Sequence, residues 1–199
     1  MQVGALVVHD VTQRIVDLED CLLIPEPAIG MLRTLRDLAE ASGLPVYHPR
    51  SHAGFYRYAI VRISHARNRL LLCLVTASAA SEAERQVSNI AGILMKQHPL
   101  LESVYWAQTD QLADAALPEQ LTHVAGKELM EDVMGPFHIQ LHPLSFIQTH
   151  SAQADRLYRA VCASLGQGTE TQTAWDLYCG AGLMSLYLSR RFRYIYGID

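Results

Sequence analysis

Residues that could bind a nucleotide cofactor are concentrated near the carboxyl end of the chain. The segment Ala174–Leu183 reads AWDLYCGAGL, in which an apolar stretch leads into Gly180 and Gly182. Two glycines let the backbone turn sharply and let a ligand approach closely, and a helix starting after them would turn its positive end toward that ligand. Asp199, seventeen residues after Gly182, could accept hydrogen bonds from both ribose hydroxyls of an adenosine. These residues predict a nucleotide-cofactor site.

Two further positions distinguish between the cofactors that such a site could bind. A nicotinamide dinucleotide site favours a third glycine at position 185, where this chain has Ser185. Asp176, in the strand before the turn, could form hydrogen bonds around a methionine moiety. The pattern therefore favours S-adenosylmethionine, with a dinucleotide as the alternative and a purely structural turn as a third interpretation.

The elements around this site follow the order helix, strand, glycine turn, helix and strand. Apolar spacing predicts helices over 151–165 and 181–191 and strands over 173–178 and 194–198. A βαβ unit of this kind belongs to a parallel sheet. We therefore expect residues 143–199 to be the start of a Rossmann-like domain.

Residues 1–142 show a different, mixed pattern that we interpret as a separate α+β domain. The fold class is thus α/β, with an α+β central domain followed by the first βαβ part of a Rossmann-like methyltransferase domain. The expected strands are 3–9, 14–17, 57–64, 69–76 and 103–108, the expected helices are 26–41 and 81–97, and three further strands at 123–125, 128–133 and 138–142 are expected to form a meander.

Composition sets outer limits on the class of protein. Half of the residues are hydrophobic and 18% are charged, which is typical of a packed globular protein. No apolar run approaches the roughly 18 residues of a membrane-spanning helix, and no secretory signal pattern opens the chain. We expect no membrane association and a cytoplasmic location.

A basic stretch lies between Ala41 and Ser81, where the chain has no Asp or Glu. Its arginines alternate with aromatic residues and could contact RNA phosphates while the rings stack on unpaired bases. A solvated strand face with half-buried tyrosines is the alternative. Side chains alternate between the two faces of a strand, and Arg57 and Arg62 are an odd number of positions apart on one expected strand. They therefore cannot both face the same side of it. The candidate RNA-binding residues are Arg50, Arg57, Arg62 and Arg67.

Several segments together resemble the bacterial RNA uridine C5-methyltransferases. WDLYCGAG at 175–182 is similar to that family's D-L-[FY]-C-G-x-G motif, and PLSFIQTH at 143–150 is similar to its F-x-Q-[TV]-N segment. YGID at 196–199 matches V-G-[IV]-[ED], and VDLEDC at 16–21 matches V-D-x-x-x-C. GLPVY at 43–47 and GFYRY at 54–58 resemble the family's central domain.

The resemblance implies an enzyme that transfers a methyl group from S-adenosylmethionine to C5 of a uridine, with 23S ribosomal RNA favoured over transfer RNA. In that chemistry a cysteine thiolate adds to C6, C5 attacks the methyl group, and a base removes the C5 proton before the cysteine leaves. The family's nucleophile and base lie downstream of the matching segments. We therefore expect this chain to be a truncated fragment with no catalytic residue and little methyl transfer of its own.

The resemblance also assigns roles to individual residues. It places Gln148, Tyr178, Leu183 and Asp199 around the cofactor and makes Cys179 a structural part of the loop. The residues that we predict to bind the cofactor are Gln148, Asp176, Tyr178, Gly180, Gly182, Leu183 and Asp199.

Cys21 corresponds by resemblance to the fourth ligand of a [4Fe–4S] cluster. The other three ligands would precede Met1, so we expect no cluster in this chain.

Two other functions stay open on the sequence alone. One is a non-catalytic RNA-binding or assembly module that keeps a vestigial cofactor loop. The other is a dinucleotide-dependent oxidoreductase.

Overall fold

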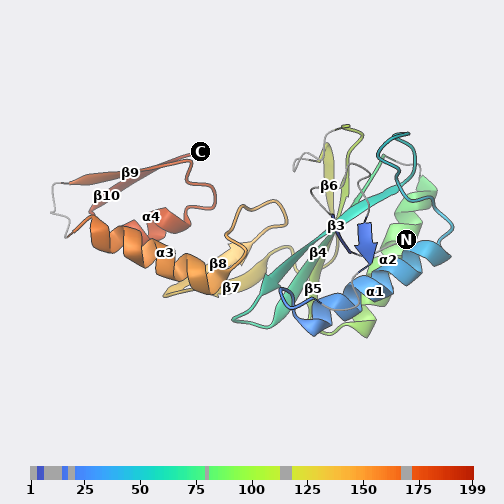
Figure 1. Ribbon diagram of the computed structural model, residues 1–199, viewed down its shortest axis with the longest axis horizontal. Helices are drawn as coiled ribbons and strands as arrows, with labels where there is room; N and C mark the ends of the chain where they lie inside the picture. Colours follow the sequence, from blue (N-terminus) through green and yellow to red (C-terminus); the bar gives the residue numbers. More distant parts are fainter. Residues whose placement is uncertain (1–3, 7–14, 18–20, 79–80, 113–117, 167–171) are drawn as a thin grey trace. The chain divides into compact units, whose positions relative to one another are not determined.

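A computed structural model of the 199-residue chain describes residues 4–6, 15–17, 21–78, 81–112, 118–166 and 172–199 (Figure 1). The chain divides into two compact units. The first contains residues 1–64 and 68–130, and the second contains residues 65–67 and 131–199. Within the described part of the chain, no helix has the length and apolarity that a bilayer crossing needs.

The first unit is built on a four-stranded sheet with the order β3-β4-β5-β6. Strand β4 pairs antiparallel with β3 and parallel with β5, and β5 pairs antiparallel with β6. The parallel pair is possible because helix α2 connects β4 to β5. The bounds are β3 (Tyr56–Ser64), β4 (Arg69–Thr76), α2 (Ser81–Gln97), β5 (Leu101–Gln108) and β6 (Gln120–Gly126).

Helices α1 (Glu26–Ala41) and α2 cover one face of this sheet (Figure 1). Met31 and Leu35 from α1 and Leu94 from α2 join the core with Leu72 and Trp106 from the strands. Strand β4 is buried on both faces, which explains its nearly continuous apolar sequence. The predicted bounds of both helices are confirmed.

Two short strands, β1 (Gly4–Leu6) and β2 (Ile15–Asp17), pair antiparallel near the amino end. They lie within the strands predicted at 3–9 and 14–17. The rest of those two predicted strands, namely Val3, residues 7–9 and Arg14, lies outside the described residues.

The predicted meander over 123–142 is only partly correct. β6 continues the main sheet, whereas β7 (Met130–Met134) and β8 (Phe137–Leu141) form a sheet of their own. Gly126, with a φ of +85°, turns the chain close to the backbone of Glu102 at the end of β6. The hairpin β7–β8 groups with the second unit, so the contacts divide the chain between residues 130 and 131.

The second unit contains the expected βαβ arrangement. Strands β9 (Thr173–Leu177) and β10 (Tyr194–Ile198) pair in parallel, and the helix that joins them, α4 (Leu183–Leu188), packs with α3 (Ser151–Ser164). Helix α4 is shorter than the predicted 181–191. Positive φ at Gly180 and Gly182 delays its start, and the amides of Arg190 and Arg191 bond three residues back, which tightens its end into a turn.

A partly buried polar contact joins the two helices of the second unit beside the β7–β8 turn. Tyr187 of α4 donates to Asp155 of α3, which also accepts two bonds from Arg159. A Cβ added at Gly135, in the β7–β8 turn, would lie 2.3 Å from both Asp155 Oδ1 and the Tyr187 hydroxyl. This position therefore requires glycine for space as well as for its φ of +55°.

Candidate functional site: a glycine turn at the end of a parallel strand pair

The turn after β9 leaves its backbone open to a ligand. Gly180 has a φ of +50° and Gly182 a φ of +72°. A Cβ added at Gly182 would meet no atom within 4 Å, and one at Gly180 would meet only Phe146, at 3.8 Å. The glycines therefore have space above them that a side chain would fill and that a cofactor could use.

Tyr178 gives this turn a left-handed residue that is not a glycine. It has a φ of +60°, which a residue with a side chain rarely adopts, and its side chain is 92% exposed. Left-handed conformations in residues other than glycine are most frequent at functional sites, where the surrounding structure enforces them. The exposed ring stands beside the glycines, as expected for an aromatic wall of the site.

Asp199 closes the other side of the turn. Parallel pairing places Ile198 of β10 opposite Leu177 of β9, so the two strands end together. The Gly180 amide donates to Asp199 Oδ1 at 3.2 Å. One carboxylate oxygen thus fixes the turn, and the other is available for a ribose hydroxyl.

Asp176 is held by a residue that we did not predict to belong to the site. Ser185 of α4 donates from its hydroxyl to Asp176 Oδ2 at 2.6 Å. Ser185 occupies the position where a dinucleotide site would favour glycine, and here its hydroxyl orients the carboxylate. A serine in the position of the third glycine could have predicted this contact, but in the sequence analysis it served only to disfavour a dinucleotide.

The Cys179 thiol packs against the neighbouring strand. The backbone amide of Cys179 donates to the Ile198 carbonyl at 3.1 Å. A Cβ added at Gly197 would lie 3.0 Å from the Cys179 Sγ. A thiol pressed onto backbone in this way supports the structural role that the resemblance implies for Cys179.

The segment before α3 places one side chain, that of Phe146, beside the turn. Gln148 is exposed, and Phe146 is 70% exposed next to Gly180. His150, which replaces the asparagine usual in the resembling motif, is the N-cap of α3, and its Nδ1 accepts from the Gln153 amide at 3.3 Å. Phe146 was part of the matched motif, but we did not predict it as a site residue.

Leu183 differs from the other predicted cofactor residues. Its side chain is buried in the core with Tyr187 and Leu188. Any contact that this residue makes with a cofactor therefore comes from its backbone.

The four candidate arginines of the basic stretch have different surroundings. Arg57 lies at a bulge of β3 and donates to the carbonyls of Thr109 and Gln111 at 2.9 and 2.8 Å, and its guanidinium lies 4.3 Å from the Tyr47 ring centroid. Arg62 is half-buried, and burial lowers its pKa. RNA binding by these residues stays a prediction.

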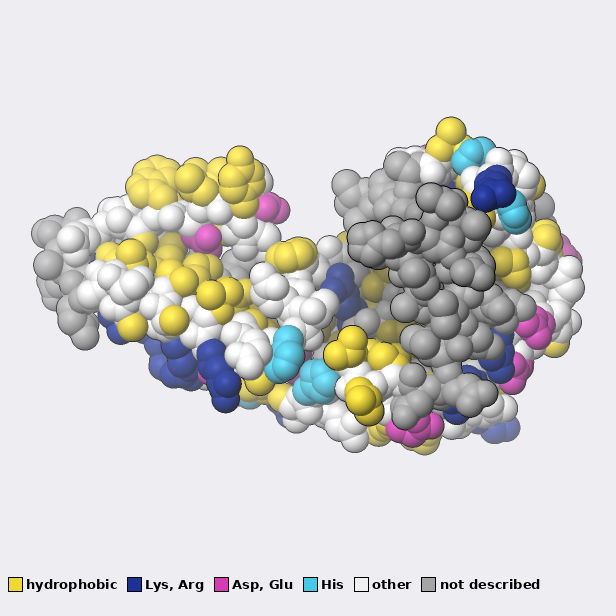
Figure 2. Space-filling model, in the orientation of Figure 1, with side chains coloured by type: hydrophobic (Ala, Val, Ile, Leu, Met, Phe, Trp, Pro, Cys, Tyr) yellow, Lys and Arg dark blue, Asp and Glu magenta, His cyan; other side chains and the backbone are white. Residues whose placement is uncertain are grey.

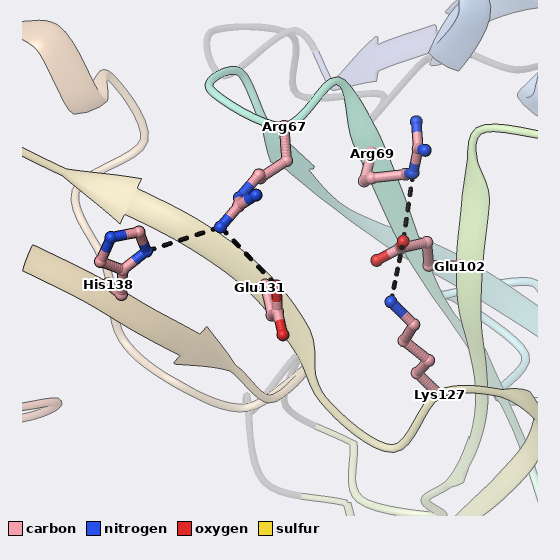
Figure 3. A network of polar contacts seen from close by, with 6 residues as sticks. All are labelled: Arg67, Arg69, Glu102, Lys127, Glu131 and His138. Carbon is pink, nitrogen blue, oxygen red and sulfur yellow. Dashed lines mark hydrogen bonds and ion pairs between the residues drawn. The ribbon is translucent and has the colours of Figure 1, made fainter.

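Arg67 and Arg50 also differ in their surroundings. Figure 3 shows Arg67 between His138 and Glu131, at 3.5 Å from the imidazole and 3.8 Å from the carboxylate. Nearby, Glu102 pairs with Arg69 and Lys127 at 3.1 and 3.2 Å. Arg50 is exposed in the loop before β3. Of the four candidates, Arg50 and Arg67 are therefore exposed, whereas Arg57 and Arg62 are partly buried.

Cys21 does not lie in a metal site of the described structure. It is a partly exposed free thiol, and the described residues contain no group of three or more His, Cys, Asp or Glu side chains that could hold a metal. The described residues therefore supply Cys21 but not the further ligands that an iron–sulfur cluster needs.

The chain is similar in sequence to proteins described as RNA methyltransferases. No protein-family model matches the chain. A Chlorobaculum tepidum protein described as an RNA methyltransferase is 30% identical over 190 residues, which are 94% of this chain and 38% of that protein. A Clostridium tetani protein with the same description is 26% identical over 189 residues, which are 94% of this chain and 40% of that protein. The chain thus spans about two fifths of the length of these relatives.

Comparison with solved structures supports the fold. The Pyrococcus abyssi tRNA (uracil-54, C5)-methyltransferase, solved with S-adenosyl-L-homocysteine, superposes with a TM-score of 0.70 at 24% identity. The match covers 94% of this chain and 43% of the Pyrococcus chain. The chain therefore has the fold of the corresponding part of a methyltransferase, which confirms the predicted α/β class.

Proposed function

We propose that this chain provides the S-adenosylmethionine-binding part of an RNA uridine C5-methyltransferase. The observation that carries the proposal is the open turn at Gly180 and Gly182, fixed by Asp199 at the shared end of two parallel strands. Helix–strand order, the acid after β10 and the held carboxylate of Asp176 all support a nucleoside cofactor with an amino-acid tail.

Different residues around the turn bind different parts of the cofactor. Asp199 offers its second oxygen to the ribose hydroxyls, and Asp176, oriented by Ser185, offers its free oxygen to the amino-acid end. The open glycines admit the cofactor close to the backbone. When bound, S-adenosylmethionine supplies an activated methyl group for transfer to a carbon nucleophile.

RNA is the substrate class that the relatives support. The Chlorobaculum and Clostridium relatives are described as RNA methyltransferases, and the Pyrococcus enzyme by its name modifies uracil in transfer RNA. The family resemblance of the motifs adds C5 of uridine and favours ribosomal RNA. We expect the 199 residues alone to transfer little methyl, because the resemblance places the nucleophilic cysteine and the base outside the segments that it matches.

Methyl transfer from labelled S-adenosylmethionine tests this proposal. The proteins compared are the 199-residue chain and a chimera in which these residues replace the matched segment of the Chlorobaculum relative. The substrates are ribosomal and transfer RNA with tritium at uridine C5, since C5 methylation releases that hydrogen into water. We expect tritium release matched by methyl uptake in the chimera, and loss of both in its Asp199→Ala variant.

The alternatives predict different results. Methyl uptake without tritium release would contradict C5 as the target. RNA binding without transfer, in a folded chimera, would favour the non-catalytic module.

A further inference from the structure

A hollow in the second unit lies outside the glycine turn. It measures about 370 Å³ and is lined by side chains from the β7–β8 turn, from α3, and from α4 and the turn that follows it. The lining residues are Pro136, Arg159, Cys162, Tyr187, Arg190 and Arg191. Three of these six side chains are arginines, so the hollow is strongly basic.

The sequence around the hollow is one-sided in charge. Residues 155–166 and 177–198 contain five arginines and one acidic residue, Asp155, although the whole chain has a net charge of −4. Figure 2 shows arginine side chains, in dark blue, gathered along the α3 side of this unit. A local excess of this kind is an electrostatic footprint for an anionic ligand.

The arginines are held in place, and two of the three, Arg190 and Arg191, are not neutralised. Arg159 uses its Nε for Asp155, and Arg191 donates from Nη1 to the Gly166 carbonyl. The guanidinium of Arg190 lies 5.5 Å from the Phe137 ring centroid. Among the described residues, no carboxylate lies within ion-pair distance of Arg190 or Arg191, so the hollow keeps an excess of two positive charges.

The other polar group of the lining does not offset this charge. The Tyr187 hydroxyl donates to Asp155, and burial, followed by this bond, raises the pKa of Tyr187. Tyr187 therefore stays neutral. The same hydrogen bonding, from Arg159 first and then Tyr187, lowers the pKa of Asp155, so this carboxylate stays charged and committed to its two partners.

We propose that this hollow binds a phosphate group of an RNA backbone, an inference that rests on the proposed RNA substrate. Planar guanidinium groups bind phosphate oxygens through paired hydrogen bonds, which suits a concave site with arginines from separate elements. The predicted basic stretch is less suitable, because Arg57 and Arg67 make contacts within the protein. The hollow gives the RNA a contact that holds it without reading its sequence.

Binding of a short single-stranded oligouridylate over a salt series tests this proposal. Each neutralised phosphate contributes about 0.7 to the slope of log affinity against log salt, so Arg190→Gln should reduce the slope by roughly that amount and weaken binding about fivefold at 0.1 M salt. Arg190→Lys keeps the charge and should keep the slope. Arg85→Gln, on an exposed arginine of α2 in the first unit, removes the same charge elsewhere and should change neither quantity.

The other results each decide against the proposal in a distinct way. Equal affinity and slope in wild type and Arg190→Gln would refute the hollow as an RNA contact. Binding of inorganic phosphate that Arg190→Gln abolishes, with oligouridylate binding unchanged, would assign the hollow to a free anion instead. A chain that binds S-adenosylhomocysteine but no oligouridylate would refute this inference and leave the methyl-donor site standing.

Discussion

Replacing Gly182 with alanine separates the backbone requirement of the turn from its use as a binding surface. The left-handed φ of +72° costs an alanine about 1 kcal/mol, and the added Cβ meets no protein atom within 4 Å. The variant should therefore fold, with a free energy of unfolding lower by about that amount. The Cβ would project into the space that we assign to the cofactor, so affinity for S-adenosylhomocysteine should fall at least about tenfold, or about 1.4 kcal/mol.

Gly166→Ala is the matched control for this prediction. Gly166 has a φ of +71° and equally open surroundings, but it follows α3 and is not part of the turn. Both variants should lose similar stability in urea unfolding, and only Gly182→Ala should lose affinity in ligand-observed NMR, a method suited to weak binding. Equal affinity in the two variants would refute the assignment of the open space above Gly182 to the cofactor.

Three further predictions concern contacts within the second unit. Gly135→Ala should lower the free energy of unfolding by about 2.5–4 kcal/mol, because it adds left-handed strain and displaces the Tyr187 hydroxyl from Asp155. Urea unfolding measures this loss of stability, and a loss near 1 kcal/mol would mean that the hydrogen bond survives. The pKa of Asp155 is depressed on folding, so its contribution to stability is complete above its unfolded pKa of about 3.9 and is lost as pH falls below that value; unfolding at pH 3 to 6 should show this loss in wild type and a flatter profile in Asp155→Asn. Ser185→Ala should weaken S-adenosylhomocysteine binding by about 1 kcal/mol, since Asp176 loses the bond that orients it; calorimetry that finds unchanged affinity would argue against that positioning role.

Local sequence patterns predicted most elements because local and tertiary preferences agree there. Helix α1 begins at Glu26, with Pro27 in its first turn, and Gly43 follows its end with a φ of +72°. Strand β4 was predicted from an apolar run that burial on both faces requires. The glycine turn and the aspartate after β10 were predicted together because a parallel strand pair brings its carboxyl ends to one edge.

The features that sequence patterns missed depend on long-range contacts. The grouping of β7 and β8 with α3 and α4 rests on Met134 and Phe137 packing in one core with Tyr187, a residue distant in the chain. Local spacing also could not show that Arg57 reaches the carbonyl of Thr109, 52 positions away. The hollow likewise combines arginines from elements whose packing appears only in three dimensions.

The central claim is that the turn after β9 binds S-adenosylmethionine, and mapping of amide NMR shifts tests it most directly. We predict that S-adenosylhomocysteine, added to the 199-residue chain, shifts the amides of Tyr178, Gly180, Gly182 and Asp199, whereas NAD shifts none of them. NAD shifting these same amides, or S-adenosylhomocysteine leaving them all unmoved, would contradict the claim.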